Sequence, residues 1–160
     1  MNITQIIKRV VIVLALTTYA FPLGYAIPQD IANPREVFCL YEALYHEARG
    51  ENKRGIIAVA NVIRNRVYSD RFSTSYCKVI YQAKQFSYVH LLPNRNTPVP
   101  SKESYKIMYM VAEDTVKGKV INVVDNNVMW YHAAYVKPKW SKKFKRTNII
   151  GKHMFYKESK

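Results

Sequence analysis

The sequence predicts an α+β fold that is mainly helical, with a small antiparallel sheet in the C-terminal third. Up to Gly118, apolar residues recur at helical spacing between capping residues. After Gly118, β-branched and aromatic segments are separated by turn residues. The chain has 160 residues, 49% of them hydrophobic and 22% charged, which is typical of one globular domain.

The first helix is expected over residues 33–50. Asn33 is a suitable N-cap, Pro34 fits the first helical position, and Glu36 stands three residues after the cap. Gly50 is typical of the residue that follows a helix end. The apolar stripe of this helix comprises Val37, Tyr41, Leu44 and Ala48.

Three further helices are expected before the sheet. The second helix places its apolar residues on one face and Asn61, Arg64 and Asn65 elsewhere. Three prolines in residues 92–100 predict a loop between the third and fourth helices. The expected bounds are residues 55–67, residues 76–82 after Ser75, and residues 101–118 from a Ser101 cap to Gly118.

Short extended segments follow Gly118. Asp125, Asn126 and Asn127 form a predicted turn, and Gly151 with Lys152 forms the turn of a predicted hairpin. The expected strands cover residues 120–124, 128–136, 147–150 and 153–156.

The N-terminal residues carry a targeting signal. Lys8 and Arg9 precede an uncharged apolar stretch, and Gly24 and Ala26 supply the small residues that a signal peptidase requires. Residues 1–26 are therefore read as a signal peptide, with a retained membrane anchor through residues 8–27 as the alternative. In both cases the domain at residues 27–160 is exported, to the periplasm or the cell wall.

Cys39 and Cys77 are the two cysteines of the chain. In an exported protein, an even pair is expected to form a disulfide rather than a catalytic or metal-binding pair. The alternative is two buried free thiols.

Glu47 is the strongest candidate for chemistry. On a helical wheel it falls about 80° from the centre of the apolar stripe, beside Leu40 and Ala43. Partly apolar surroundings raise the pKa of a carboxyl group, as a general acid near neutral pH requires. The structural alternative is a solvated ion pair of Glu47 with Arg49 or Arg54.

Metal and cofactor motifs are not found. His46 and Glu47 begin like the zinc-binding H-E-x-x-H motif, but Gly50 occupies the second histidine position. The sequence also lacks a P-loop, a G-x-G-x-x-G motif and a G-x-S-x-G nucleophile motif. We therefore expect no metal and no cofactor.

Two other features are candidates for binding surfaces. Residues 130–140 hold five aromatic rings, His132 included, which could line a sugar-binding groove or belong to a half-buried strand. Residues 137–160 hold nine Lys and Arg and one acid, Glu158, within a chain of net charge +14. We expect these lysines to be exposed and to attract anionic envelope polymers.

Five stretches, in order, resemble the SleB-type cell-wall hydrolase family, which includes spore-cortex-lytic enzymes and phage and bacterial lysins. The resemblance covers residues 36–157, with two departures: Tyr88 replaces the usual tryptophan, and residues 90–100 do not follow the family pattern. The stretches are Cys39-Leu40 through Tyr45-His46-Glu47-Ala48-Arg49-Gly50-Glu51, Ile57 through Asn65-Arg66-Val67, Cys77 through Gln85-Phe86-Ser87, Tyr131-His132-Ala133 through Trp140, and Arg146-Thr147 through Ile150-Gly151-Lys152-His153 and Phe155-Tyr156.

The resemblance implies a lysozyme-like fold and cleavage of the β-1,4 bond between N-acetylmuramic acid and N-acetylglucosamine in peptidoglycan. Spore-cortex members are lytic transglycosylases, and the catalytic glutamate of the family falls on Glu47. Gln85, Ser87, Tyr131 and Tyr135 are candidates for holding the N-acetyl groups and the strained sugar. The expected protein is a monomer that binds peptidoglycan strands.

Three alternatives remain open from the sequence. One is a hydrolytic muramidase in which Glu51 or Asp125 activates water, although Glu51 follows Gly50 and is expected to be less rigidly held. Another is a non-catalytic, basic envelope-binding protein. The third, an exported nuclease or nucleic-acid binder, would need a metal cluster or a base-stacking platform, and no metal signature is found, so no nucleic-acid partner is expected.

Overall fold

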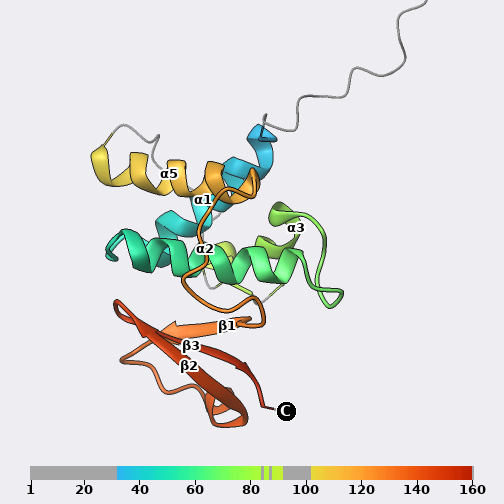
Figure 1. Cartoon of the computed structure of the whole chain (residues 1–160), viewed down its shortest axis with the longest axis vertical. Helices are drawn as coiled ribbons and strands as arrows, with labels where there is room; N and C mark the ends of the chain where they lie inside the picture. The colour runs from blue at the N-terminus through green and yellow to red at the C-terminus, as the bar shows by residue number, and fades with distance from the viewer. Residues whose placement is uncertain (1–31, 84, 87, 92–101, 160) are drawn as a thin grey trace, which may run out of the picture.

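The computed structural model describes residues 32–83, 85–86, 88–91 and 102–159. Helix α2 lies between the other long helices and a three-stranded antiparallel sheet (Figure 1). The α+β prediction, with the sheet in the C-terminal third, is confirmed. The elements are α1 (Pro34–Ala48), α2 (Lys53–Val67), α3 (Tyr76–Ile80), α4 (Tyr88–Leu91), α5 (Glu103–Val116), β1 (Trp130–Ala133), a 3₁₀ helix η3 (Lys139–Lys143), β2 (Phe144–Ile150) and β3 (His153–Glu158).

Helix α1 begins where its capping residues predict. The Asn33 side chain accepts a hydrogen bond from Arg35 N at 3.0 Å. Glu36 does not act within a capping pair; it accepts from Ser75 Oγ at 2.8 Å and from Cys77 N at 3.3 Å. The carboxylate of Glu36 therefore joins the first turn of α1 to the start of α3.

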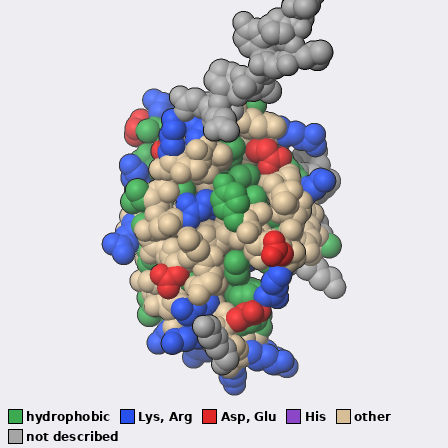
Figure 2. Space-filling view, turned by 45° about the vertical axis from the view of Figure 1, so that its right-hand side comes forward, with side chains coloured by type: hydrophobic (Ala, Val, Ile, Leu, Met, Phe, Trp, Pro, Cys, Tyr) green, Lys and Arg blue, Asp and Glu red, His purple; other side chains and the backbone are tan. Residues whose placement is uncertain are grey.

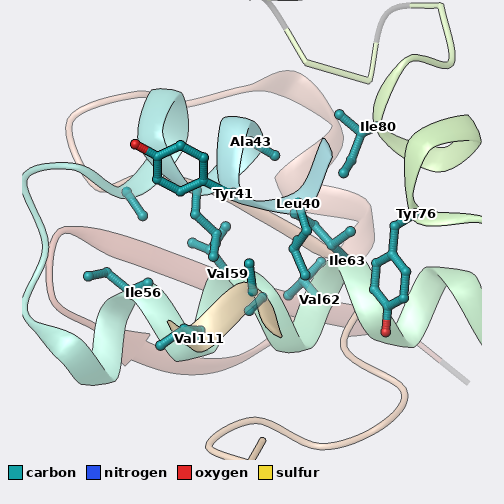
Figure 3. Close-up of a cluster of buried hydrophobic side chains, with 14 of the residues drawn as sticks. Leu40, Tyr41, Ala43, Ile56, Val59, Val62, Ile63, Tyr76, Ile80 and Val111 are labelled. Atoms are coloured by element: carbon teal, nitrogen blue, oxygen red, sulfur yellow. The ribbon is translucent and has the colours of Figure 1, made fainter. Parts of the chain in front are cut away.

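The predicted pairing of Cys39 with Cys77 is present as a disulfide between α1 and α3, with the two Cα atoms 5.2 Å apart. It lies at the edge of the main apolar core. Figure 3 shows this core, in which Leu40 of α1 packs with Val59 and Ile63 of α2. Both cysteines are buried, so the disulfide is shielded from solvent.

Helix α2 is buried on all sides, contrary to the expectation of one apolar face. Residues 55–67 are buried throughout, including Asn61, Arg64 and Asn65. These side chains are buried because each finds hydrogen-bond partners in the segment that follows α5, as buried polar groups require.

The strand expected over residues 120–124 is not formed; the segment runs along α2 instead. Its backbone pairs with the Asn61 side chain, which donates to Ile121 O at 3.1 Å and accepts from Val123 N at 2.8 Å. The segment starts at Gly118, whose φ of 72° ends α5 as glycine readily allows. Side-chain amides thus take the place of a neighbouring strand.

The sheet has the order β1-β3-β2, with β3 antiparallel to both neighbours. The predicted hairpin around Gly151 is confirmed and is longer than expected, because β2 starts at Phe144. Tyr131 lies opposite Phe155, and both pack against the helical core. Trp130 lies opposite Tyr156 on the other face. The aromatic run is therefore divided between the two faces of the sheet.

Several sequence expectations lie outside the described residues. These are the signal peptide or anchor in residues 1–26 and 8–27, the loop at residues 92–100 and the Ser101 cap. Within the described ranges, no helix is both long and apolar enough to cross a membrane.

Removing the disulfide is predicted to destabilise the fold. The bond closes a loop with a sequence separation of 38, and the double variant Cys39→Ala/Cys77→Ala is expected to lower the free energy of unfolding by about 3–4 kcal/mol. Urea denaturation measures this loss. Reducing agent should lower the stability of the wild type and leave the variant unchanged. Two titratable thiols in exported, unfolded and non-reduced protein would contradict the pairing.

Candidate active site

Glu47 lies near the end of α1, on the side of the helix that faces α2 and the sheet. Ala43 and Leu40, one and two turns earlier, are fully buried beneath it, as the helical wheel predicts. The half-buried carboxyl group of Glu47 lines a cavity of about 530 Å³. The described residues around this cavity are His46, Glu47, Arg66, Gln85, Phe86, Tyr131, His132, Ala133, Tyr135 and His153.

Burial raises the pKa of Glu47 above its ordinary value. Two neighbours act in the opposite direction: Tyr131 donates a hydrogen bond to Glu47 Oε2 at 3.3 Å, and the Arg66 guanidinium carries a positive charge. Burial prevails, so the carboxyl group keeps its proton to a higher pH than an exposed glutamate would. Such a group can donate a proton near neutral pH.

Tyr131 is placed by the register of β1 against β3. Burial, followed by the nearby Glu47 charge, holds the pKa of the Tyr131 phenol well above its ordinary value. The phenol therefore stays protonated and acts as a donor to Glu47. Its ring packs edge-on against His153 of β3, with the ring centres 5.3 Å apart.

Glu51 has a different environment from Glu47, although only four residues separate them. Its carboxylate accepts from Lys152 N at 3.0 and 3.2 Å and lies 3.3 Å from His153 Nδ1. The side chain is only 4% exposed. The expectation that Glu51 is loosely held is therefore wrong, because the turn of the β2–β3 hairpin binds it.

Two glycines make room for the Glu51 carboxylate. A Cβ atom on Gly151, whose φ is +58°, would lie 1.7 Å from Glu51 Oε2, and one on Gly55 would lie 2.6 Å from it. Asp125, the other acid considered for activating water, has a side chain that is 71% exposed and lies 3.9 Å from Lys157. It does not line the cavity that holds Glu47.

The structure places three of the four predicted sugar-binding residues at this cavity. Tyr131 contacts Glu47, Gln85 lines the wall, and Tyr135 stands at the rim with 87% of its surface exposed. Ser87 lies outside the described residues. Trp130 and Trp140 pack with Phe144 and Tyr156 on the far face of the sheet. Trp130 belongs to β1, as the half-buried-strand alternative expects, whereas Trp140 lies in η3.

Sequence reasoning assigned no role to Arg66, His46 or His153, which also line the cavity. A signal for Arg66 exists, because it stands at helical spacing from Val59 and Ile63 on the apolar face of α2. His46 reaches the cavity from the side opposite the apolar stripe, where its ring stacks on Tyr88 at 4.3 Å. A helical wheel of α1 could not predict this contact, because Tyr88 belongs to α4.

The alternative ion pair of Glu47 with Arg49 is not what the structure shows. Arg49 Nη1 donates to Tyr45 Oη at 3.4 Å, and its guanidinium lies 5.4 Å from the centre of the Tyr45 ring. Arg49 is exposed, so this contact leaves the Glu47 carboxyl group to Tyr131 and the cavity.

Comparison with known proteins yields one family. A family model described as Cell Wall Hydrolase matches residues 50–156. The chain is similar to a spore cortex-lytic enzyme of Bacillus cereus, with 27% identity over 140 residues that cover 84% of this chain and 48% of the relative. The chain therefore spans about half the length of the curated relatives it matches.

Two solved structures are similar in fold. The catalytic domain of the germination-specific lytic transglycosylase SleB from Bacillus anthracis has a TM-score of 0.65 and 28% identity, covering 78% of this chain and 96% of that one. The catalytic domain of Bacillus cereus SleB has a TM-score of 0.65 and 26% identity, covering 84% and 100%. The lysozyme-like arrangement implied by the sequence thus has matching structures in the SleB group.

Glu51→Gln is predicted to lower the free energy of unfolding by about 1–3 kcal/mol, because it removes the negative charge beside His153 and turns one of the two oxygens that accept from Lys152 N into an NH2 group facing that donor. Urea denaturation measures the change. The control is Glu113→Gln on α5, whose surface pair with Lys117 is worth at most about 1 kcal/mol. Equal stability of the two variants would show that Glu51 does not hold the hairpin.

Proposed function

We infer the function of this chain from its membership of the Cell Wall Hydrolase family, whose model matches residues 50–156. The protein is an enzyme that cleaves the β-1,4 glycosidic bond between N-acetylmuramic acid and N-acetylglucosamine in peptidoglycan. The observation that carries this proposal is the half-buried Glu47, whose raised pKa and position at the cavity suit a general acid. The names of its relatives, a spore cortex-lytic enzyme and a lytic transglycosylase, support the same substrate.

In the first step Glu47 donates its proton to the glycosidic oxygen that leaves with N-acetylglucosamine. The bond between that oxygen and C1 of the muramic acid breaks, and positive charge develops on the sugar ring. Glu47 becomes a carboxylate at this point, while the Tyr131 hydroxyl donates to it. Because burial raises the pKa of Glu47, the group keeps this proton to a higher pH than an exposed glutamate would, as a general acid requires.

In the second step the C6 hydroxyl of the same muramic acid attacks C1. A bond forms between that oxygen and C1, and Glu47 takes the hydroxyl proton, which restores its acid form. The product is a 1,6-anhydro sugar, and no water is consumed. Because the nucleophile is tethered to the reacting carbon, proximity replaces a positioned water molecule.

The cavity contains one carboxyl group among its described lining residues, and this favours transglycosylation over hydrolysis. Ordinary glycosidases use two carboxyl groups, one as acid and the other as base or nucleophile. Glu51, the nearest second acid in sequence, is engaged by Lys152 N and His153. If the enzyme were instead a hydrolytic muramidase, its product would be heavier by one water than the 1,6-anhydro product.

The sugar-binding roles follow from position. Gln85 in the wall and Tyr135 at the rim are assigned to the N-acetyl groups and the sugar rings of the strand. Tyr131 is assigned to the strained muramic acid, because its hydroxyl already meets Glu47. Ser87 keeps the role that the sequence resemblance implies for it.

The C-terminal basic region supports binding to anionic envelope polymers. Eight of its nine Lys and Arg lie in the described part of the chain, and all but the half-buried Lys157 are exposed, as predicted. Figure 2 shows Lys and Arg side chains gathered at the lower end of the molecule, which is the sheet end in Figure 1. We assign the protein to the exterior of the cytoplasmic membrane, as a monomer, with residues 1–26 directing its export.

Glu47→Gln is predicted to fold normally and to lose about 10²–10⁴-fold in activity on purified peptidoglycan, because the general acid is removed. Release of muropeptides, read by mass spectrometry, measures the rate. The wild-type product should be lighter by one water than a hydrolysis product. The exposed Glu103→Gln on α5 is the control and should keep wild-type activity. A Glu47→Gln variant with more than a tenth of the wild-type rate would exclude this role.

The triple variant Lys142→Gln/Lys143→Gln/Lys145→Gln is predicted to lose activity on whole walls at low salt and to keep it on a short neutral glycan. Attraction to a wall rich in carboxylates or phosphates weakens as the Debye length falls from ~30 Å at 0.01 M to ~8 Å at 0.15 M salt. At high salt, the wild type should therefore show the same reduced activity on whole walls that the variant shows at low salt.

A control variant removes the same charge elsewhere, at the exposed residues Lys53, Lys78 and Lys106. It should change wall activity less than the C-terminal variant does. Equal loss by the C-terminal variant on the wall and on the neutral glycan would assign its lysines to the active site or the fold.

A further inference from the structure

Arg66 is a buried cation beside the cavity that holds Glu47. Its residue surface is 6% exposed, and its Nε donates to Met129 O at 2.9 Å. Its Nη1 is buried and has no hydrogen-bond partner among the described residues. The side chain lines the same cavity as Glu47. One donor of the guanidinium is thus unused at the cavity wall.

Two aromatic rings hold the guanidinium in place. The Arg66 Cζ atom lies 5.7 Å from the ring centres of both Phe72 and Phe86. Such cation–π contacts, together with the hydrogen bond to Met129 O, restrict the orientation of the planar Arg66 guanidinium. A buried donor without a partner costs free energy, and arginine cannot avoid the cost by losing its proton. We therefore expect the Arg66 guanidinium to gain a negatively charged partner during part of the acid–base cycle of the proposed function.

We propose that Arg66 is a positioning residue that stabilises the carboxylate form of Glu47 after its proton has left, with Nη1 as the donor that a Glu47 oxygen takes up. This inference rests on the acid–base cycle of the proposed function. When Glu47 protonates the leaving oxygen, negative charge appears in a half-buried site. A fixed positive charge already in place stabilises that charge without reorganisation.

The charge balance at Glu47 agrees with this role. Burial alone raises the pKa of Glu47, and the Arg66 charge lowers it, so the group can both release and regain a proton. Arg66 is the one Lys or Arg among the described lining residues. Burial lowers the pKa of His46 and of His153, which favours their neutral forms. The titratable groups that face Glu47 from the surrounding elements are His46, Tyr88, Tyr131, His132, Tyr135 and His153.

The direct test follows the Glu47 carboxyl group by ¹³C NMR titration of the substrate-free protein, with the Glu47 signal identified by its absence in Glu47→Gln. Arg66→Met is expected to raise the pKa of Glu47, because the neutral variant removes the opposing charge. Arg66→Lys, which keeps the charge, should restore most of the wild-type value. Should Arg66→Met not fold, Arg66→Gln carries the same test, since its amide can still donate to Met129 O.

Arg64→Met is the matched control. Arg64 is a buried arginine of the same helix, but it donates to Val120 O and to Asn122 and lines a different cavity. It should leave the pKa of Glu47 unchanged. An unchanged or lowered pKa in the neutral Arg66 variants, or the same rise in Arg64→Met, would overturn the proposal.

Kinetics on peptidoglycan provide the second readout. The neutral Arg66 variant is expected to lose about 10²–10³-fold in kcat with little change in KM, and the alkaline limb of its pH–rate profile should move to higher pH. A loss of activity that comes only from unfolding would not shift the alkaline limb of the pH–rate profile. A wild type that does not cleave peptidoglycan would refute the proposed function, whereas the NMR titration would still decide the role of Arg66.

Discussion

A row of hydrogen bonds from α2 to the chain that follows α5 determines where the sheet lies. Asn61 and Arg64 bind the backbone of residues 120–123, Asn65 binds Asp125 O and Val128 O, and Arg66 binds Met129 O. Each partner is about sixty residues away in sequence, so local propensity contributes nothing to this pairing. The row fixes the segment along α2 and delivers Met129 to the start of β1.

The geometry of the cavity around Glu47 depends on two attachments of the sheet to the helices. The first is the Arg66 bond to Met129 O, two residues before Tyr131. The second is at the other end, where Glu51 binds the turn of the β2–β3 hairpin through Lys152 N. Between these points β3 holds β1 in register, and the Tyr131 hydroxyl reaches Glu47. A small sheet held at both ends can position a donor more closely than a free hairpin could.

Local signals in the sequence were sufficient for most helices and for the hairpin. Caps at Asn33 and Ser75 and the positive-φ glycines 118 and 151 have the roles expected of them. The predictions of a single apolar face on α2 and of a strand at residues 120–124 are wrong. The sequence alone does not distinguish an asparagine that bonds to a distant backbone from a solvated one. The prediction of Glu47 from the edge of an apolar stripe led to a residue that lines a cavity, and its catalytic role stays a prediction. Arg66 was passed over although its helical spacing on the apolar face of α2 signals burial, and the position of His153 at the cavity depends on how β3 meets the helices.

The two glutamates at the end of α1 show how environment separates like groups. Glu51 meets a backbone N–H and a histidine, and two glycines leave space for both of its oxygens. Among the described residues, Glu47 accepts from the Tyr131 hydroxyl at 3.3 Å, and its side chain lines the cavity. Burial raises the pKa of Glu47 against the opposing effects of Tyr131 and Arg66, whereas the contacts of Glu51 attach it to the hairpin. Among the described residues that line the cavity, Glu47 is the one carboxyl group, because the contacts of Glu51 commit that side chain to the hairpin, and this agrees with the proposed mechanism in which the substrate supplies the nucleophile.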